Sequence, residues 1–284
     1  MKTITTLLIS ASLLASQATA TELTILNSGS KTGSFSMTSI AYYTDMLKSY
    51  DQINLVNPGT RCVAIGSLLP RIEGPVLMPW GSDYEASGRN GGCVTFDISK
   101  GQVLRYNKEP VSVCTMKPEL NITSVSGKVA HTVPVDGPLS RVTGQINSSF
   151  NTNHENVTYD GSGAVRLALV NGEVDYALLS REHVTYVEQN GGSCDYNLTT
   201  GVNSLYNLDP TNPKLVFGFD NIWLALNMTK EEAATLKATL IEKHENCDSA
   251  IAKYTGCGMM PNMYFDMTDE EARAAWEPVV ESQR

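Results

Sequence analysis

The sequence predicts an α/β protein made of two lobes with a cleft between them. Apolar segments of strand length alternate with segments of helical periodicity, which is typical of parallel sheets with crossover helices. This alternation runs from residue 23 to residue 80, is interrupted, and starts again at residue 128. The 284 residues, less a leader of 20, leave 264, which is room for two lobes of about 100–150 residues each.

The first half contains three predicted strands, each followed by a helix or a loop. The helix after the first strand has Met37, Ile40, Tyr43 and Leu47 at helical spacing, and Asn57-Pro58-Gly59 stops the second strand. The predicted elements are a strand at Leu23–Leu26, a helix at Phe35–Tyr50, a strand at Ile53–Val56, a helix at Cys62–Leu69, a strand at Val76–Trp80, and a polar, Gly-rich loop at Gly81–Gly92.

The pattern restarts after a hairpin-like region at Val94–Val113. Capping boxes at Thr229–Glu232 and Thr268–Glu271 mark the starts of two late helices. The other predicted elements are strands at Val111–Cys114, Lys128–Val133, Asn156–Tyr159, Val174–Leu179, Lys214–Phe219 and Ile222–Leu226, and helices from Pro138 and over Ala164–Val170.

The chain is expected to cross between the lobes twice, near Val111–Lys117 and near Lys214–Asp220. The first lobe is then discontinuous and comprises residues 21–115 and 220–284, and the second lobe comprises residues 116–219.

The first 20 residues have the pattern of a secretory signal peptide. Lys2 forms a positive n-region, Ile4–Leu14 is apolar but too short to span a bilayer, and Ala18–Ala20 is a small-residue cleavage site. A buried N-terminal helix is the alternative. We expect a periplasmic or secreted protein, cleaved after Ala20, that is not itself membrane-spanning, because no later segment is long and apolar enough.

Acidic residues outnumber basic ones by 30 to 21, which gives a formal net charge of −9. Phosphate binding requires a basic field, so this balance argues against a nucleic-acid partner.

Six cysteines in an exported chain favour disulfides, although six allow 15 pairings. Cys247 and Cys257 are ten residues apart and flank a helix end, so they are the first candidate pair, and Cys62 with Cys93 is the second. The sequence contains no C-x-x-C or H-E-x-x-H motif and its four histidines are scattered. We therefore expect no metal site and no cofactor.

Three Gly/Ser loops follow predicted strands and precede helices: Gly29–Ser36, Asp136–Ser140 and Asp160–Gly163. In open α/β sheets, ligands bind outside the carboxyl ends of the strands. Helix N-termini there offer free N–H groups and a partial positive charge, which suits an anion. The alternative is that these loops are only turns and caps.

The most specific stretch, Val157–Ala164, continues through Leu169–Asp175. It resembles the V-P-Y-K-G-S-G-P and L-x-G-G-x-V-D segments of the Bug/TctC family, the extracytoplasmic solute-binding receptors of tripartite tricarboxylate transporters. Residues Phe217–Leu226, Lys230–Lys243 and Asp269–Val280 resemble that family's later strand and helices. The first loop departs from the family, since it has Lys31 and lacks a G-G-x-x-D run, and six cysteines and the long Gly81–Gly92 loop are also unusual for it.

The resemblance implies a type II periplasmic binding protein fold and a receptor rather than an enzyme. It implies capture of a small organic anion, di- or tricarboxylate-like, by hinge closure, and delivery to the membrane subunits of a transporter. The ligand-binding residues that it implies are Gly33, Ser34, Phe35 and Ser36 in the first lobe and Gly137, Leu139, Ser140, Gly161, Ser162 and Gly163 in the second.

Two other functions are alternatives. A secreted α/β hydrolase would need a nucleophile and a base, but the S-x-x-K and K-T-G matches at Ser28–Gly33 share Lys31, and no G-x-S-x-G elbow occurs. The other alternative is a secreted protein that is cross-linked by disulfides and binds another ligand. Arg61 and Arg89 are possible carboxylate partners or surface residues, and Trp80 lines the cleft or belongs to the core.

Overall fold

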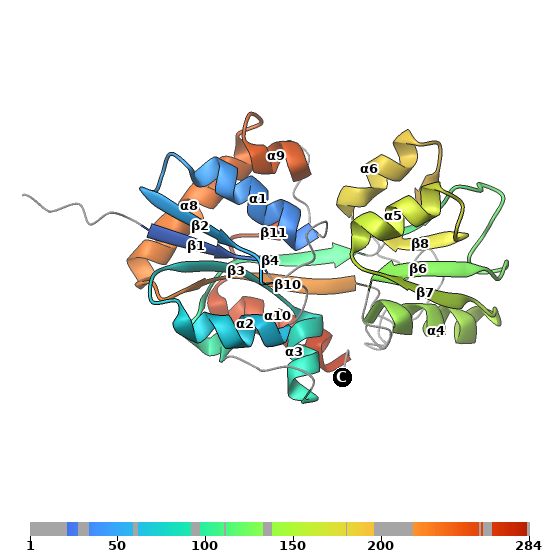
Figure 1. The fold of residues 1–284 in the computed structure, drawn as a ribbon. Coiled ribbons are helices and arrows are strands. Elements are labelled where there is room, and N and C mark those ends of the chain that lie inside the picture. The colour runs from blue at the N-terminus through green and yellow to red at the C-terminus, as the bar shows by residue number, and fades with distance from the viewer. Residues whose placement is uncertain are drawn as a thin grey trace, which may run out of the picture.

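A computed structural model of the chain describes residues 22–27, 34–58, 62–91, 97–110, 112–132, 138–179, 181–195, 218–255, 257 and 263–282. These residues form two separate β-sheets, of six and five strands, each covered by helices on both faces (Figure 1). We call the six-stranded sheet with its helices lobe 1 and the five-stranded sheet with its helices lobe 2.

Lobe 1 has the strand order β11-β4-β10-β3-β1-β2. The parallel strands are β1 (Glu22–Leu26), β2 (Gln52–Val56) and β3 (Val76–Gly81), whereas β10 (Gly218–Leu226), β4 (Gln102–Pro110) and β11 (Met263–Tyr264) pair antiparallel. Thus β4 pairs with strands from the end of the chain and does not close a local hairpin, contrary to the prediction for Val94–Val113.

Helices cover both faces of the lobe 1 sheet (Figure 1). On one face α1 (Ser34–Met46), α8 (Lys230–Glu245) and α9 (Ala250–Thr255) pack on residues such as Ile25 and Trp223. On the other, α2 (Cys62–Leu68), the 3-10 turn η1 (Leu69–Arg71), α3 (Ser82–Arg89) and α10 (Asp269–Ser282) pack on residues such as Met78 and Leu224. A second 3-10 turn, η2 (Ile98–Lys100), precedes β4.

Lobe 2 has the strand order β7-β6-β8-β5-β9. Its parallel strands are β6 (Lys128–Thr132), β7 (Glu155–Tyr159) and β8 (Tyr176–Leu179), and its antiparallel strands are β5 (Ser112–Thr115) and β9 (Ser193–Asp195). The helix α4 (Pro138–Phe150) packs on one face with Val129 and Leu178, and α5 (Ser162–Val170) and α6 (Arg181–Gln189) pack on the other with Ala130 and Leu179.

The two sheets repeat one topology. In each, the first parallel strand lies between the second and third, and an antiparallel strand joins beside the third, giving β2-β1-β3-β10 and β7-β6-β8-β5. The predicted two-lobed α/β fold is confirmed. Residues 112–115, which the sequence assigned to the first lobe, pair in the lobe 2 sheet, and β10 already starts at Gly218.

One local prediction was wrong. The stretch predicted as the loop Gly81–Gly92 contains α3, because Asp83 and Glu85 lie in the first turn of this helix and Arg89 in its last, where each charge favours the helix dipole. Glu85 and Arg89 also form an i,i+4 ion pair.

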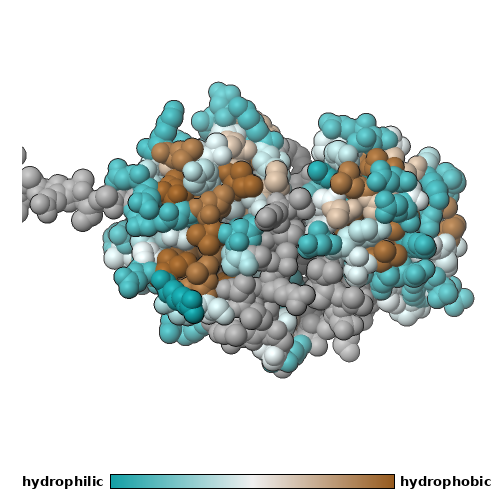
Figure 2. All heavy atoms as spheres, in the orientation of Figure 1, coloured by the Kyte–Doolittle hydropathy of each residue, from teal (hydrophilic) through white to brown (hydrophobic). Residues whose placement is uncertain are grey.

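The predicted helix after the first strand is present as α1, and the structure shows which of its sides is buried. Three of the apolar residues at helical spacing point to solvent, with Met37, Ile40 and Leu47 exposed by 39%, 43% and 51%. Figure 2 shows apolar surface gathered on this side of lobe 1. The buried side of α1 instead carries Ser39 and Tyr42, because the Tyr42 ring packs edge-to-face on Trp223 at 4.9 Å.

Both predicted capping boxes are present. The Thr229 hydroxyl accepts the N–H of Glu232, and the Glu232 carboxylate accepts the N–H of Thr229. Thr268 and Glu271 make the same reciprocal pair at the start of α10. Each box satisfies N–H groups that a helix start leaves free.

Two disulfides occur among the described residues. Cys247 and Cys257 are joined across the segment that contains α9. Cys114 and Cys194 are joined between β5 and β9, where they are directly opposite in the register. The sequence did not single out this second pair. Cys93 lies outside the described residues, so its pairing with Cys62 stays a prediction.

Candidate functional site

The topology directs the carboxyl ends of both sets of parallel strands toward each other. The strand β10 arrives from lobe 2, and β3 runs antiparallel to it, so β3 ends on the side that faces lobe 2 (Figure 1). By the same argument β5 enters from lobe 1, and β8 ends facing lobe 1. The strand order reverses at β1/β3 and at β6/β8, the positions where α/β sheets bind ligands.

The predicted lobe 1 residues lie after β1, at the start of α1. Phe35 is half-buried and Ser36 is buried, 4% exposed. Ser34 is the first residue of the helix, and Gly33 lies outside the described residues. The Phe35 ring meets Tyr84 of α3 edge-on at 6.3 Å, so α1 and α3 begin side by side at this end of the sheet.

The predicted lobe 2 residues divide into two groups. Gly161 is the N-cap of α5 with a φ of 90°, a conformation that favours glycine, and Ser162 and Gly163 form the first turn. No acidic residue lies in that turn, so its N–H groups can donate hydrogen bonds to an anion. Leu139, by contrast, is buried among core residues such as Ile146, which gives its side chain a packing role. Ser140 lies in α4, and Gly137 is outside the described residues.

The start of α3 is part of this end of the sheet and was missed from the sequence, which treated it as a loop. A Cβ atom built on Gly81 would collide with the Asp83 carboxylate and lie 3.7 Å from Cε2 of Phe35. The three residues therefore meet at one point. Burial raises the pKa of the Asp83 carboxyl to about 6, although the backbone N–H groups of Tyr84 and Asp83 oppose this.

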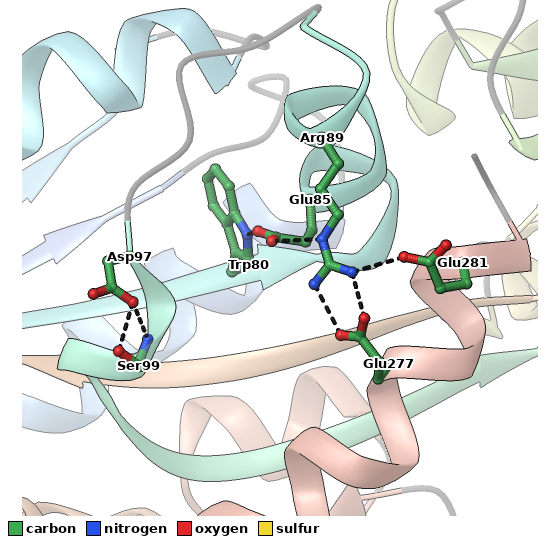
Figure 3. Close-up of polar contacts among 7 residues, drawn as sticks. All are labelled: Trp80, Glu85, Arg89, Asp97, Ser99, Glu277 and Glu281. Carbon is green, nitrogen blue, oxygen red and sulfur yellow. Dashed lines mark hydrogen bonds and ion pairs between the residues drawn. The ribbon is translucent and has the colours of Figure 1, made fainter.

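Arg89 is engaged by carboxylates of the chain itself (Figure 3). Its Nε atom donates to Glu85 at 3.1 Å, and its Nη atoms donate to Glu277 at 2.8 Å and to Glu281 at 2.9 Å. Trp80 is fully buried and donates Nε1–H to the other oxygen of Glu85 at 3.0 Å. Arg89 thus ties α3 to α10, and Trp80 belongs to the core. Arg61 lies outside the described residues.

Lobe 2 has a buried histidine near the end of β6. His131 is 0% exposed, its Nδ1 atom lies 2.9 Å from the carbonyl oxygen of Thr132, and burial lowers its pKa. Further along α5, the Arg166 guanidinium lies over the Tyr186 ring, 4.3 Å from its centroid. Asp175 pairs with Lys117 at 2.8 Å and accepts the N–H of Lys128, which is a structural role.

A groove of about 840 Å³ lies elsewhere, along the edge strand β2 of lobe 1. It reaches Glu22 at the start of β1 and Gly74 just before β3, so it lies toward the amino ends of the strands. Within the described residues, no group of three or more His, Cys, Asp or Glu side chains is arranged to hold a metal ion.

Among solved structures, several match this chain over nearly its whole length. The periplasmic binding protein BugD has a TM-score of 0.65 at 11% identity, covering 92% of this chain and 95% of its own. MatC from Rhodopseudomonas palustris with bound malate has a TM-score of 0.62 at 14% identity, covering 92% and 97%. This chain has the fold of the periplasmic binding proteins.

A second R. palustris protein, solved with adipate, has a TM-score of 0.60 at 13% identity and covers 92% of this chain and 94% of its own. The neighbours include a TctC solute-binding protein from Polaromonas as well as BugD, so the resemblance to the Bug/TctC family seen in the sequence is confirmed at the level of the fold. No protein-family profile matches the sequence, and no curated protein sequence does. Across the described residues, no helix has the length and apolar character of a membrane span.

Proposed function

We propose that the protein is a periplasmic receptor that captures a small organic carboxylate in the cleft between its lobes. One observation carries the proposal: α5 starts at Gly161–Gly163 on the side of lobe 2 that faces lobe 1, with no acid in its first turn. Free N–H groups and the helix dipole suit a carboxylate at such a start. Two solved structural neighbours contain malate and adipate, which supports this ligand class.

The lobes are proposed to be residues 21–115 with 220–284, and residues 116–219, with the whole of β5 moved to the second lobe and the first two residues of β10 moved to the first lobe, as their pairing indicates. Hinge closure over the ligand would then favour the closed state, since only that state contacts the ligand from both sides. We propose that a leader is removed after Ala20, and the disulfides are consistent with an oxidising compartment. The receptor would deliver its ligand to the membrane subunits of a tripartite transporter and would not be an enzyme.

The test is thermal unfolding of residues 21–284 with a panel of mono-, di- and tricarboxylates. A ligand that binds only the native state at 100 times its Kd stabilises it by about 2.7 kcal/mol. We expect Ser162→Asp to abolish this shift by repulsion. Ser148→Asp, on the exposed end of α4, is the matched control and should keep it.

If no carboxylate in the panel raises the unfolding temperature, the result would count against the receptor proposal. Turnover of ester substrates by the purified protein would instead revive the hydrolase. Solution scattering adds a second readout, because hinge closure predicts a smaller radius of gyration in the presence of the ligand.

A further inference from the structure

The end of the lobe 1 sheet that faces lobe 2 carries a set of polar side chains, most of them buried, that the proposed function does not use. They come from three strand ends: Ser82 and Asp83 after β3, Asn221 on β10 and Asn107 on β4. We propose that these residues, called the lobe 1 floor, form a subsite for a hydrogen-bond-donating group of the ligand, a hydroxyl or an ammonium. This inference rests on the proposed function and adds a subsite for a second polar group of the ligand.

The strand register places the two asparagines and Gly81, which directly precedes Ser82, together. Asn221 lies directly opposite Gly81 on one side and opposite Asn107 on the other. Directly opposed residues of antiparallel strands share a face of the sheet, with Cβ atoms about 5 Å apart. Next to them, Trp223 and Arg105 are opposed in the same way, and the guanidinium lies 5.2 Å from the Trp223 ring centroid. Since Trp223 packs on Tyr42, this face is the one beneath α1.

Gly81 brings the start of α3 onto the same face. The space that a Cβ of Gly81 would fill is taken by the Asp83 carboxylate, with Phe35 of α1 beside it. Because Gly81 is opposite Asn221, the carboxylate lies over the same row of residues as the two amides. Here β3 ends while β4 and β10 continue toward lobe 2, so the row lies at the end of the lobe 1 sheet that faces lobe 2 (Figure 1).

Three of the floor residues are buried and carry polar atoms without a hydrogen-bond partner within the described part of the chain, whereas Asp83 is half-buried and accepts backbone N–H groups. Asn221 and Ser82 are 0% exposed and Asn107 is 2% exposed. No hydrogen bond is made by Oδ1 or Nδ2 of Asn221, Oδ1 of Asn107 or Oγ of Ser82. Buried polar groups in folded proteins are nearly always paired, so a group of such atoms at one place points to a polar partner.

The atoms define the chemistry of that partner. Two are carbonyl oxygens that only accept, one is an amide nitrogen that donates, and the serine hydroxyl does both. The Asp83 carboxylate adds further acceptors and a negative charge at neutral pH. A ligand carboxylate also only accepts, so it would leave the two carbonyl oxygens unsatisfied and be repelled by Asp83. A hydroxyl or an ammonium satisfies them.

The two ends of the cleft therefore select different groups. The start of α5 in lobe 2 suits the carboxylate, and the lobe 1 floor suits the donor. The ligand class that fits both is a hydroxy acid or an amino acid, and not an unsubstituted aliphatic acid.

The experiment is calorimetry on residues 21–284 with matched triples that differ only at one substituent: succinate, malate and aspartate, then glutarate, 2-hydroxyglutarate and glutamate, then propionate, lactate and alanine. We expect at least a ten-fold preference for the hydroxy or the amino member of one triple over its unsubstituted parent. Asn221→Leu should reduce that preference to within two-fold. Asn54→Leu, on β2 of the same sheet, is the matched control and should leave it unchanged.

Asp83→Asn distinguishes the two donors. If the donor is an ammonium, this variant should weaken the amino member at least ten-fold more than the parent acid, because it removes the opposite charge. If the donor is a hydroxyl, the hydroxy member should lose less than three-fold.

A structural role for Asn221 gives a different result. An amide that holds the fold would lower Tm when it is replaced by leucine, whereas removal of an unpartnered buried amide should leave Tm of the ligand-free protein unchanged or raise it. A lower Tm with the preference intact would overturn the subsite. Equal binding of parent and substituted acids would also overturn it and leave the receptor proposal standing. The absence of binding by every acid would instead remove the proposed function itself.

Discussion

The two lobes present the same strand order to each other but different chemistry. Lobe 2 offers the start of α5, where Gly161–Gly163 carry no acid in the first turn. Lobe 1 offers the start of α3, which has Asp83 and Glu85 in its first turn, above two buried asparagines. In our proposals, one topology thus carries a site built on backbone N–H groups and a site built on side-chain acceptors. The difference indicates that a repeated fold does not imply a symmetric ligand.

The lobes also differ in the length of chain that their disulfides enclose. Removal of these disulfides gives the largest expected effect on stability. The Cys114–Cys194 disulfide of lobe 2 spans 80 residues, whereas Cys247–Cys257 of lobe 1 spans 10. Chain entropy predicts losses of about 4.5 and about 3 kcal/mol when each is removed. We expect the Cys114→Ser/Cys194→Ser variant to lower the free energy of unfolding more than Cys247→Ser/Cys257→Ser. Urea unfolding checks this, and the reverse order would show that lobe 1 depends more on its staple.

The contact between α3 and α10 gives the next largest expected effect on stability. Arg89→Met removes the cation that pairs with Glu85 and with two exposed carboxylates of α10. Glu85 is only 7% exposed and also accepts a hydrogen bond from Trp80. We expect lobe 1 to lose about 1–3 kcal/mol, chiefly because Glu85 stays buried without its cation. Glu281→Gln removes one exposed contact and should cost less than about 1 kcal/mol. Equal losses in the two variants, measured by urea unfolding, would contradict a special role for Glu85.

The response of lobe 1 to pH is a smaller effect, and it has two opposing parts. Burial and the nearby Arg105 lower the pKa of His244 to about 3. Its Nε2 atom lies 2.7 Å from the Tyr42 hydroxyl and 3.1 Å from Nη1 of Arg105, which can only donate. The folded state therefore keeps this ring neutral. As pH falls from 6.5 toward 3, the unfolded chain binds a proton that the fold does not, and stability is lost.

Asp83 changes the stability of the folded state with pH in the opposite direction. Its folded pKa of about 6 lies above the ordinary 3.8, so its contribution is fully present below pH 4 and is lost as pH rises through 6. We expect His244→Phe to flatten the acid limb of a plot of Tm against pH, and Asp83→Asn to raise Tm at pH 7 relative to pH 4. Asp160→Asn, an exposed carboxyl beside α5, serves as the control for net charge. An unchanged pH profile in both variants would mean that neither group is shielded as the structure indicates.

The sequence singled out the residues of the proposed lobe 2 site but not those of the proposed lobe 1 floor, for a physical reason. The signals at Asp160–Gly163 are local, since a strand end, two glycines and a helix start follow one another in the chain. The lobe 1 floor depends on register instead: Asn107 and Asn221 are far apart in sequence and meet only because β4 and β10 pair. Likewise, Cys114 and Cys194 become neighbours only through the pairing of β5 with β9. Pairing of distant strands is not encoded in any short motif.

The orientation of α1 provides the smallest effect and the sharpest test of this explanation. Met37, Ile40 and Leu47 recur at helical spacing, but the structure exposes them and buries Ser39 at 0% exposure, one turn before Tyr42. If the structure is right, Ile40→Ser should change the free energy of unfolding by less than about 0.5 kcal/mol, as surface substitutions usually do. Tyr42→Phe should cost about 1–3 kcal/mol, because it removes the hydroxyl that contacts both Arg105 and His244. Urea unfolding compares the two. A loss above about 2 kcal/mol for Ile40→Ser would mean that α1 turns its apolar stripe inward, and it would move Phe35 and Ser36 away from the floor of the cleft.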